Sequence, residues 1–398
     1  FGSSQLSSQS ETIPINRKRY NFSAMVSIRL LVSMTVGVHC VAGLYHQSTS
    51  SSIDSFEEYV KTFARDYVPG TPEYKFREQL FHQRLIQIKK HNALPGAKWT
   101  AGINHLVDRT DEEFSRLHGW RRSHGPSAQA GDVSLASQEQ SIELPDSVNW
   151  QDLTAVKNPK DQGYCGSCWA MATSTMLEGR YEVAKKSFRS FSAQQLVDCV
   201  ENPLSCGGTG GCEGATVELA MDYIMAKGIR EESAVPYTGF DGACPDEDSY
   251  SLFGMSSDAN VVTVQNYKTL ASNQAKPLME ALVDGPVAIS AAASDWMLYM
   301  NGIFDGCSMD AVVNHAVVLV GYGTENGQNY WTVQNSWGKY WGENGFIRVL
   351  RADSIEEDDA HCGTDHAPED GIECKPYPDS VEVCGMCGIL YDSVIANF

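Results

Sequence analysis

One cysteine, Cys168, stands where its thiol could act as a nucleophile. It follows a Gly166-Ser167 turn that should lead into a helix. The positive end of a helix dipole and a neighbouring imidazolium both lower the pKa of a thiol toward the reactive thiolate. Six residues upstream, Gln162 is in reach to donate a side-chain N–H to a tetrahedral oxyanion, beside the backbone N–H of Cys168. The alternative, a Cys165–Cys168 disulfide, would break the even count of the other cysteines.

The number of cysteines favours an oxidising compartment. The chain has 12 cysteines; Cys40 lies in a predicted signal segment, and Cys168 is set aside as a free thiol. The remaining ten are an even number, as five disulfides require, and disulfides persist outside the reducing cytosol. These ten are Cys165, Cys199, Cys206, Cys212, Cys244, Cys307, Cys362, Cys374, Cys384 and Cys387.

Two further motifs follow at long range. His315 lies in Asn-His-Ala-Val and Asn335 in Gln-Asn-Ser-Trp-Gly, 147 and 167 residues after Cys168. With the Cys-Gly-Ser-Cys-Trp run that ends at Trp169, they resemble the papain and cathepsin L family of cysteine proteases. The resemblance covers about residues 54–398.

The resemblance implies a role for each residue. The Cys168 thiolate attacks a peptide carbonyl, and His315 acts as the base and then as the acid for the leaving amine. Gln162 forms the oxyanion hole with the backbone N–H of Cys168. Asn335 orients His315, and Trp337 covers that hydrogen bond against water. We expect neither a cofactor nor a metal ion.

The resemblance also implies an α+β, papain-like two-lobe fold. A helical left lobe and an antiparallel β-barrel-like right lobe follow a helical inhibitory prosegment. The sequence predicts a helix over 111–118, one from about Ser167, one capped by Ser192, and one over 215–226. Strands are predicted later, over 288–291, 311–320, 330–334 and 346–350. The stretch 352–382 is longer than the family's usual connection, and we expect a surface loop pinned by disulfides.

The prosegment helix carries a stripe of unlike side chains. Six residues with spacings of 4, 4, 3, 4 and 4 share one face: Glu73, Arg77, Phe81, Arg84, Ile88 and Asn92. We interpret this stripe as a face that docks on another surface. It resembles the family's inhibitory motif, with Arg84 where Asn is usual. Gly102, Asn104 and Asp108 match a second prosegment motif, in which Leu106 replaces Phe.

Composition divides the chain into four expected segments. Residues 1–24 are an untranslated leader or extension, and 25–43 are a signal peptide that starts at Met25. Its apolar run is too short to span a bilayer; a buried core helix is the alternative. Residues 44–141 hold the inhibitory prosegment and an exposed Ser-rich linker at 123–141, where proteases cut. The mature peptidase domain is 142–398.

Charge is divided in the same way. Residues 142–398 hold 14 basic and 37 acidic residues, a net charge of −23, whereas the rest of the chain has 16 and 13, a net charge of +3. We therefore expect the prosegment to dock on the body through opposite charge. By the resemblance, it runs through the cleft backwards and leaves at low pH.

Three features bear on substrate binding. By the resemblance, Gly214 and Ala215 pair with the substrate backbone, and Ala215 stands where Gly is usual. Trp337 is also expected to bind substrate. Asp392 matches the floor of the second specificity pocket, which predicts cleavage after Phe-Arg or Leu-Arg and tolerance of Arg-Arg. Alternatively, Asp392 points to solvent. The paired histidines that block the cleft in carboxydipeptidase relatives are not seen, which favours an endopeptidase.

The resemblance implies three disulfides, Cys165–Cys212, Cys199–Cys244 and Cys307–Cys387. Cys206, Cys362, Cys374 and Cys384 are left, with three possible pairings. Alternatively, the thiolates of Cys362, Cys374, Cys384 and Cys387 bind zinc, because Cys384-x-x-Cys387 has ligand spacing.

The composition limits the partners. A net charge of −20 disfavours nucleic acid. We expect a monomeric zymogen of the secretory pathway that acts in a lysosome or vacuole or outside the cell, with no membrane partner. Its partners are peptide and protein substrates, its own prosegment and cystatin-like inhibitors. Two alternatives are a protease-like binding protein or inhibitor, which loss of the Cys, His or Asn would favour, and a transglutaminase, which would not explain the prosegment motifs.

Overall fold

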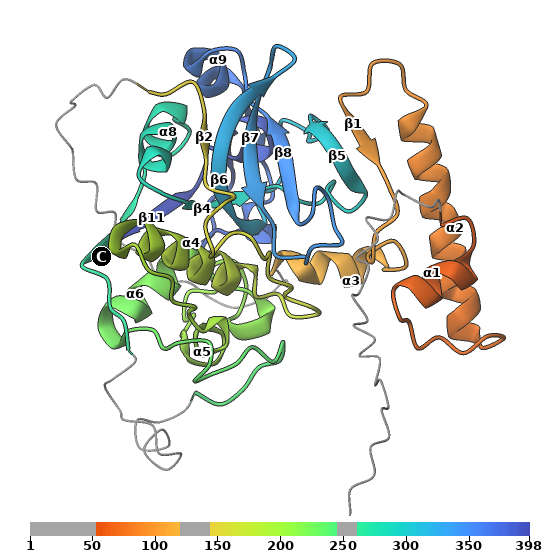
Figure 1. Ribbon diagram of the computed structural model, residues 1–398, viewed down its shortest axis with the longest axis horizontal. Helices are drawn as coiled ribbons and strands as arrows, with labels where there is room; N and C mark the ends of the chain where they lie inside the picture. Colours follow the sequence, from red (N-terminus) through yellow and green to blue (C-terminus); the bar gives the residue numbers. More distant parts are fainter. Residues whose placement is uncertain (1–52, 120–143, 245–260) are drawn as a thin grey trace, which may run out of the picture. The chain divides into compact units, whose positions relative to one another are not determined.

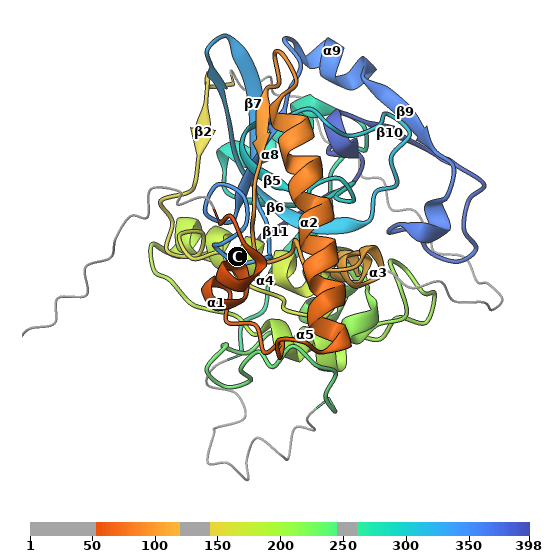
Figure 2. The same cartoon turned by 90° about the vertical axis from the view of Figure 1, so that its right-hand side faces the viewer.

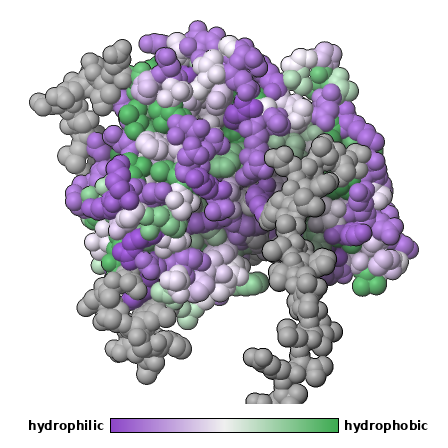
Figure 3. Space-filling view, viewed as in Figure 1, coloured by the Kyte–Doolittle hydropathy of each residue, from purple (hydrophilic) through white to green (hydrophobic). Residues whose placement is uncertain are grey.

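The computed structural model describes residues 53–119, 144–244 and 261–398. The predicted leader, the signal segment with Cys40, and the linker at 123–141 lie outside the described residues. Figure 1 shows two lobes and a prosegment. The face in Figure 3 is largely hydrophilic, with apolar residues in small separate groups. No helix in the described ranges has the length and apolar character needed to cross a bilayer.

The helical lobe is built around α4 (Cys168–Lys185), which is buried along most of its length. α5 (Ala193–Cys199) and α6 (Val217–Lys227) pack beside α4, and the 3-10 helix η2 (Gly211–Glu213) lies between them in the chain. The predicted cap of α5 is confirmed, since Ser192 Oγ accepts a hydrogen bond from Gln195 N at 2.9 Å. The predicted helix at 215–226 is present, but it begins at Val217.

The second lobe is a nine-stranded sheet in the order β1-β5-β8-β7-β6-β4-β11-β3, with β2 paired to β6. β5 and β8 are parallel, and the other neighbours are antiparallel. The helix α8 (Ala275–Val283) packs on β4 and β6. The strands are β1 (Trp99–Ala101), β2 (Val148–Asn149), β3 (Asn266–Thr269), β4 (Val287–Ala291), β5 (Tyr299–Phe304), β6 (His315–Glu325), β7 (Gln328–Gln334), β8 (Phe346–Leu350) and β11 (Ser393–Asn397).

The strand predicted over 311–320 is wrong at its start, because β6 begins at His315. Val313 O accepts a hydrogen bond from Ile372 N, outside the sheet. Asn314 N still donates to Ala291 O at the end of β4, but its Oδ1 accepts from Ala293 N beyond that strand. Within β6, alternate side chains face two cores, which explains its continuous apolar run. Ala316, Val318 and Val320 pack toward the helical lobe, whereas Val317 and Leu319 pack in the opposite core.

The prosegment has helices of its own and adds one strand to the sheet. β1 pairs antiparallel with β5 at the sheet edge, so backbone hydrogen bonds attach the prosegment to the body. In Figure 1 the long helix α2 stands beside β1. The helices are α1 (Phe56–Thr62), α2 (Pro72–Asn92), α3 (Asp111–Ser115) and the 3-10 helix η1 (Arg116–His118), of which the last two confirm the predicted short helix.

The striped face of α2 packs on other parts of the prosegment itself. Arg77 and Arg84 form ion pairs with Glu113 and Asp111 of α3. Asn92 exchanges two hydrogen bonds of 2.8 Å with the backbone of Ala101 in β1. The prediction of a docking face is thus confirmed, but its partner is the prosegment. Charge therefore stabilises the prosegment's own fold, and the ion pair of Lys98 with Asp305, at 3.4 Å, also joins the prosegment to the acidic body.

The stretch 352–382 is more ordered than the predicted surface loop. It contains α9 (Ile355–Ala360), β9 (Cys362–Asp365), the 3-10 helix η3 (Pro368–Asp370) and β10 (Val381–Cys384), and η4 (Met386–Gly388) follows. β9 and β10 form an antiparallel hairpin. In Figure 2 this stretch, drawn in blue, descends from β9 and β10 along one side of the molecule.

Five disulfides join ten cysteines of the described chain. Three are the pairs that the resemblance implied, Cys165–Cys212, Cys199–Cys244 and Cys307–Cys387. The other four cysteines pair as Cys206–Cys374 and Cys362–Cys384. The zinc alternative is wrong, because each of its four cysteines is in a disulfide and supplies no thiolate.

Candidate active site under the prosegment

Cys168 is the first residue of α4 and is fully enclosed. It is the one cysteine of the described residues that is outside a disulfide. Burial raises the pKa of its thiol to about 11, although the backbone N–H groups of Ala316, Trp169 and Cys168 itself act in the opposite direction. The sulfur donates a hydrogen bond to His118 O at 3.6 Å. In this form Cys168 is therefore a protonated thiol.

His315 is the first residue of β6, and Asn335 sets its orientation. Asn335 Oδ1 lies 2.8 Å from His315 Nε2 and also accepts the N–H of Ser336 at 2.7 Å. Because this oxygen can only accept, Nε2 carries the proton and Nδ1 has a free lone pair. Nδ1 is buried without a hydrogen-bond partner. Burial lowers the pKa of His315 to about 4, outweighing the opposing effect of the Asn335 hydrogen bond.

Trp337 lies over the His315 ring. The two ring centroids are 4.9 Å apart with 29° between the planes, and Trp337 is 1% exposed. Its indole keeps water away from the buried hydrogen bond between His315 and Asn335. A shielded hydrogen bond of this kind is stronger than one that competes with solvent.

The side-chain amide of Gln162 is held at both ends. Its Oε1 accepts a hydrogen bond from Ser336 Oγ at 2.6 Å. Its Nε2 donates to Leu117 O at 2.8 Å and to Cys165 O at 2.9 Å. Leu117 O, a carbonyl oxygen of the prosegment, thus accepts a hydrogen bond from the Gln162 N–H group that the resemblance assigns to the oxyanion.

Residues 116–119 of the prosegment lie along the groove past Cys168. Beyond the Leu117 and His118 contacts, Gly119 rests on Gly214: a Cβ atom added to Gly214 would lie 1.3 Å from Gly119 O. Gly214 has φ +96°, so this position requires glycine for its backbone as well as for the contact. The prosegment backbone thus runs from Gln162, past Cys168, toward Gly214.

An aromatic cluster anchors this segment beside His315. The Phe114 ring lies 5.2 Å from Trp337 and 4.7 Å from His118, measured between centroids. The His118 ring lies 5.6 Å from that of His315. Burial, with the nearby His315, lowers the pKa of His118 well below its usual range. The prosegment therefore docks with a neutral His118.

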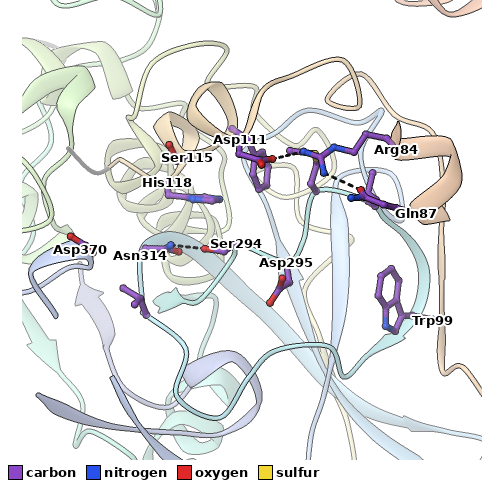
Figure 4. Close-up of a pocket in the computed structure, with 14 residues that line it drawn as sticks. Arg84, Gln87, Trp99, Asp111, Ser115, His118, Ser294, Asp295, Asn314 and Asp370 are labelled. Atoms are coloured by element: carbon purple, nitrogen blue, oxygen red, sulfur yellow. Dashed lines mark hydrogen bonds and ion pairs between the residues drawn. The ribbon is translucent and has the colours of Figure 1, made fainter. Parts of the chain in front are cut away.

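A cavity of about 570 Å³ remains between the prosegment and the β lobe. Figure 4 shows Arg84 and Asp111 paired on the prosegment side and Asn314 donating to Ser294 on the other. Burial raises the pKa of Asp295, which also lines it. The cavity adjoins Ser115 and His118, so it is the part of the groove that the prosegment leaves unfilled away from Gly214.

Asp392 does not point to solvent, so that alternative is wrong. Its carboxylate accepts a hydrogen bond from Ser290 Oγ at 2.6 Å and shares another with Glu218. Burial and the charge of Glu218 raise the pKa of Asp392 well above its usual range. Ser290 lies in β4 and Glu218 in α6, so both lobes contribute contacts to this carboxyl. Ala215 is buried next to Gly214.

Four polar residues of the site were not singled out in the sequence. Ser336 directly follows Asn335, so the motif itself could have indicated it. His118 lies in the predicted short helix, but no neighbouring pattern marks it as a groove residue. Glu218 and Ser290 meet Asp392 only through the packing of the two lobes, and no local spacing connects them.

The chain is similar to known proteins over most of its length. The family model "Papain family cysteine protease" matches residues 144–370, and "Cathepsin propeptide inhibitor domain (I29)" matches 56–114. A cathepsin L-like proteinase of Fasciola hepatica is 33% identical over 329 residues, covering 81% of this chain and 92% of its own. Zingipain-2 of Zingiber officinale is 40% identical over 225 residues, 56% and 93% of the two chains. The structure of digestive procathepsin L 3 from Tenebrio molitor matches with a TM-score of 0.66 and 28% identity, over 86% and 98% of the chains.

Proposed function

Because the chain belongs to the papain family of cysteine proteases and carries that family's propeptide inhibitor domain, we propose that Cys168, His315, Asn335 and Gln162 form its catalytic site. The protein is a cysteine-type endopeptidase in zymogen form. The observation that carries the assignment is the Asn335–His315 hydrogen bond of 2.8 Å under Trp337. It leaves Nδ1 of His315 free as a base in the groove that holds Cys168.

Catalysis begins when the prosegment leaves. Water then reaches the groove, the pKa of the Cys168 thiol falls and that of His315 rises, and a proton passes from Sγ to Nδ1. The thiolate attacks the peptide carbonyl, and the oxyanion accepts hydrogen bonds from Gln162 Nε2 and Cys168 N–H. His315 then protonates the leaving amine, and water hydrolyses the thioester.

Two buried prosegment histidines support release of the prosegment by acid. Burial lowers the pKa of His118, and it lowers that of His105 to about 4. A released histidine titrates near 6.5, so the released state binds more protons below that pH. Docking is therefore strongest above about pH 6.5 and weakens as the pH falls, by about 1.4 kcal/mol per unit for each histidine.

Asp392 supports acceptance of a basic residue in the second pocket. Its raised pKa leaves it neutral in acid until a guanidinium binds, so preference for Arg should grow as the pH rises. Asp392→Asn should lower the ratio of kcat/KM for Arg-Arg over Phe-Arg substrates by about tenfold, since one charged contact is lost. An unchanged ratio would show that the pocket does not use this carboxyl.

The same groove would bind peptide and protein substrates and cystatin-like inhibitors. The five disulfides of the described residues support a place in the secretory pathway, because disulfides persist in oxidising compartments. We place its action in an acidic lysosome or vacuole or outside the cell, as a monomer. Fractionation of the producing cells and light scattering of the purified chain would test these two points.

The decisive test compares the full chain with Cys168→Ala, both incubated at about pH 4–5, where carboxylates titrate. The wild type should lose its first segments near residue 141 and gain peptidase activity. Cys168→Ala should keep the same circular dichroism spectrum and show no turnover. Wild-type turnover by Cys168→Ala would assign the chemistry to another nucleophile.

A further inference from the structure

The cavity of about 570 Å³ and Gly214 lie on opposite sides of Cys168. Prosegment residues 117–119 run past Gln162 and Cys168 to Gly214. The cavity is lined instead by the preceding part of this segment, which includes Phe114. The prosegment thus enters the groove beside the cavity and leaves it at Gly214.

The cavity also lies next to His315. Asn314, the preceding residue, lines it and donates a hydrogen bond to Ser294 Oγ at 3.0 Å. The His118 ring, also in the lining, has its centroid 5.6 Å from that of His315. In the proposed mechanism His315 protonates the leaving amine, so the substrate segment that begins with this amine lies on the His315 side. The residues after the scissile bond are therefore directed into this cavity.

The body side of the cavity is acidic. Of the body residues in its lining, Asp295 and Asp370 are charged, and the others are neutral. Figure 4 shows both carboxyl groups, with the bonded pair of Asn314 and Ser294 drawn between them. A hollow lined by one sign of charge raises the local concentration of groups of the opposite sign. The wall therefore favours a cation.

The surroundings of Asp295 offer it little compensation for burial. Asp295 lies in the loop between β4 and β5, beside the buried Trp296. Burial is the cause that raises the pKa of its carboxyl, and no cation of the described residues contributes to lower it. A basic side chain placed in the cavity would supply the missing opposite charge.

Asp370 reaches the cavity from the stretch 352–382. It ends η3, and Ile372 N, two residues later, donates to Val313 O at 3.0 Å. This hydrogen bond holds the stretch beside Asn314 in the cavity wall. The long connection thus adds a second carboxylate to the groove.

The prosegment supplies the guanidinium of the lining. Arg84 forms an ion pair with Asp111 on the prosegment side. Both residues leave with the prosegment. Among the residues that line this cavity in the described chain, the mature domain then keeps two carboxylates and no basic side chain.

We propose that the cavity selects substrates with Lys or Arg among the first three residues after the scissile bond, and that Asp295 contacts this side chain. Asp370 adds to the attraction from the opposite part of the wall. The inference rests on the proposed function, because the leaving side is defined by Cys168 as nucleophile and His315 as acid.

The test uses internally quenched peptides that are cleaved after Phe-Arg and carry Ala at the next three positions. Each Ala is replaced in turn by Lys or by the neutral Gln. With mature enzyme, kcat/KM should be about fivefold higher for Lys than for Gln at one or more positions. In Asp295→Asn the ratio should fall below twofold. High salt should lower the wild-type ratio, because it screens the charges.

The matched control is Asp305→Asn, which removes a carboxylate of the β lobe outside this cavity and should keep the ratio. Phe-Arg-aminomethylcoumarin has no residue after the cleaved bond, so wild type, Asp295→Asn and Asp305→Asn should cleave it equally. Equal kcat/KM for Lys and Gln at all three positions overturns the inference, and so does a wild-type ratio in Asp295→Asn. No cleavage of Phe-Arg-aminomethylcoumarin by wild-type enzyme overturns the proposed function instead.

Discussion

Two segments of the molecule contact both lobes, but they are held in different ways. Over Cys168 and His315 lies the prosegment, held by the β1–β5 pairing, by aromatic rings and by neutral histidines. The second segment is residues 371–377, which we name the strap; the Cys206–Cys374 disulfide and backbone hydrogen bonds hold it to both lobes.

The two kinds of attachment differ in whether a change of pH can release them. Burial of an ionisable ring gives a contact that weakens as protons are taken up. A disulfide does not respond to pH in this range, and its two halves both belong to the expected mature domain, 142–398. We therefore expect the prosegment to be a temporary cover, whereas the strap stays attached to both lobes.

Phe114→Ala should weaken the docking of the prosegment on the body, and this is the largest effect that we expect. The Phe114 ring is 4% exposed and packs on Trp337, so its loss should cost about 3 kcal/mol of docking, or about 100-fold in the release equilibrium. The zymogen should then activate faster and at higher pH, as followed by the appearance of peptidase activity. Phe76→Ala, on an exposed position of α2, is the control and should activate like the wild type. Equal activation of both variants would contradict the anchoring role of Phe114.

Removing the strap's disulfide should cost more stability than removing the hairpin's. Cys206–Cys374 closes 168 residues and Cys362–Cys384 closes 22. In the chain-entropy model the longer loop contributes about 2 kcal/mol more to the free energy of unfolding. Urea unfolding of the two Cys→Ser pairs, in a Cys168→Ala background that prevents self-cleavage, measures the difference. Equal losses would mean that the strap does not constrain the two lobes.

His118→Phe should remove one proton-binding group from the prosegment. The ring keeps its contacts with Phe114 and Trp337, but it no longer titrates. Below about pH 6.5 the release equilibrium should rise less steeply, by up to one proton, and the pH of half-activation should fall. His82→Phe, exposed on α2, should leave the slope unchanged. An unchanged slope for His118→Phe would assign acid release to other groups.

The reacting groups were predictable because each lies in a short motif whose residues act together. Cys168 begins a helix, Asn335 and Trp337 are two residues apart, and local geometry decides how they face one another. The start of β6 was not predictable from its apolar run, because Val313 and Asn314 bond to distant segments. The striped face of α2 was recognised as a contact surface, but its partner depended on where residues 108–113 folded back.

The sequence by itself determined which thiol is free, which residues are available to the reaction, and that a prosegment precedes them. Only the tertiary structure decided that Cys206 pairs with Cys374. The two residues are 168 positions apart in the chain and come together only where distant segments pack. It likewise decided that Asp392 meets Glu218 and Ser290, and that Leu117 O takes the hydrogen bond of Gln162. Local sequence specifies chemistry through adjacent atoms, whereas a groove and its covers exist only where distant segments pack together.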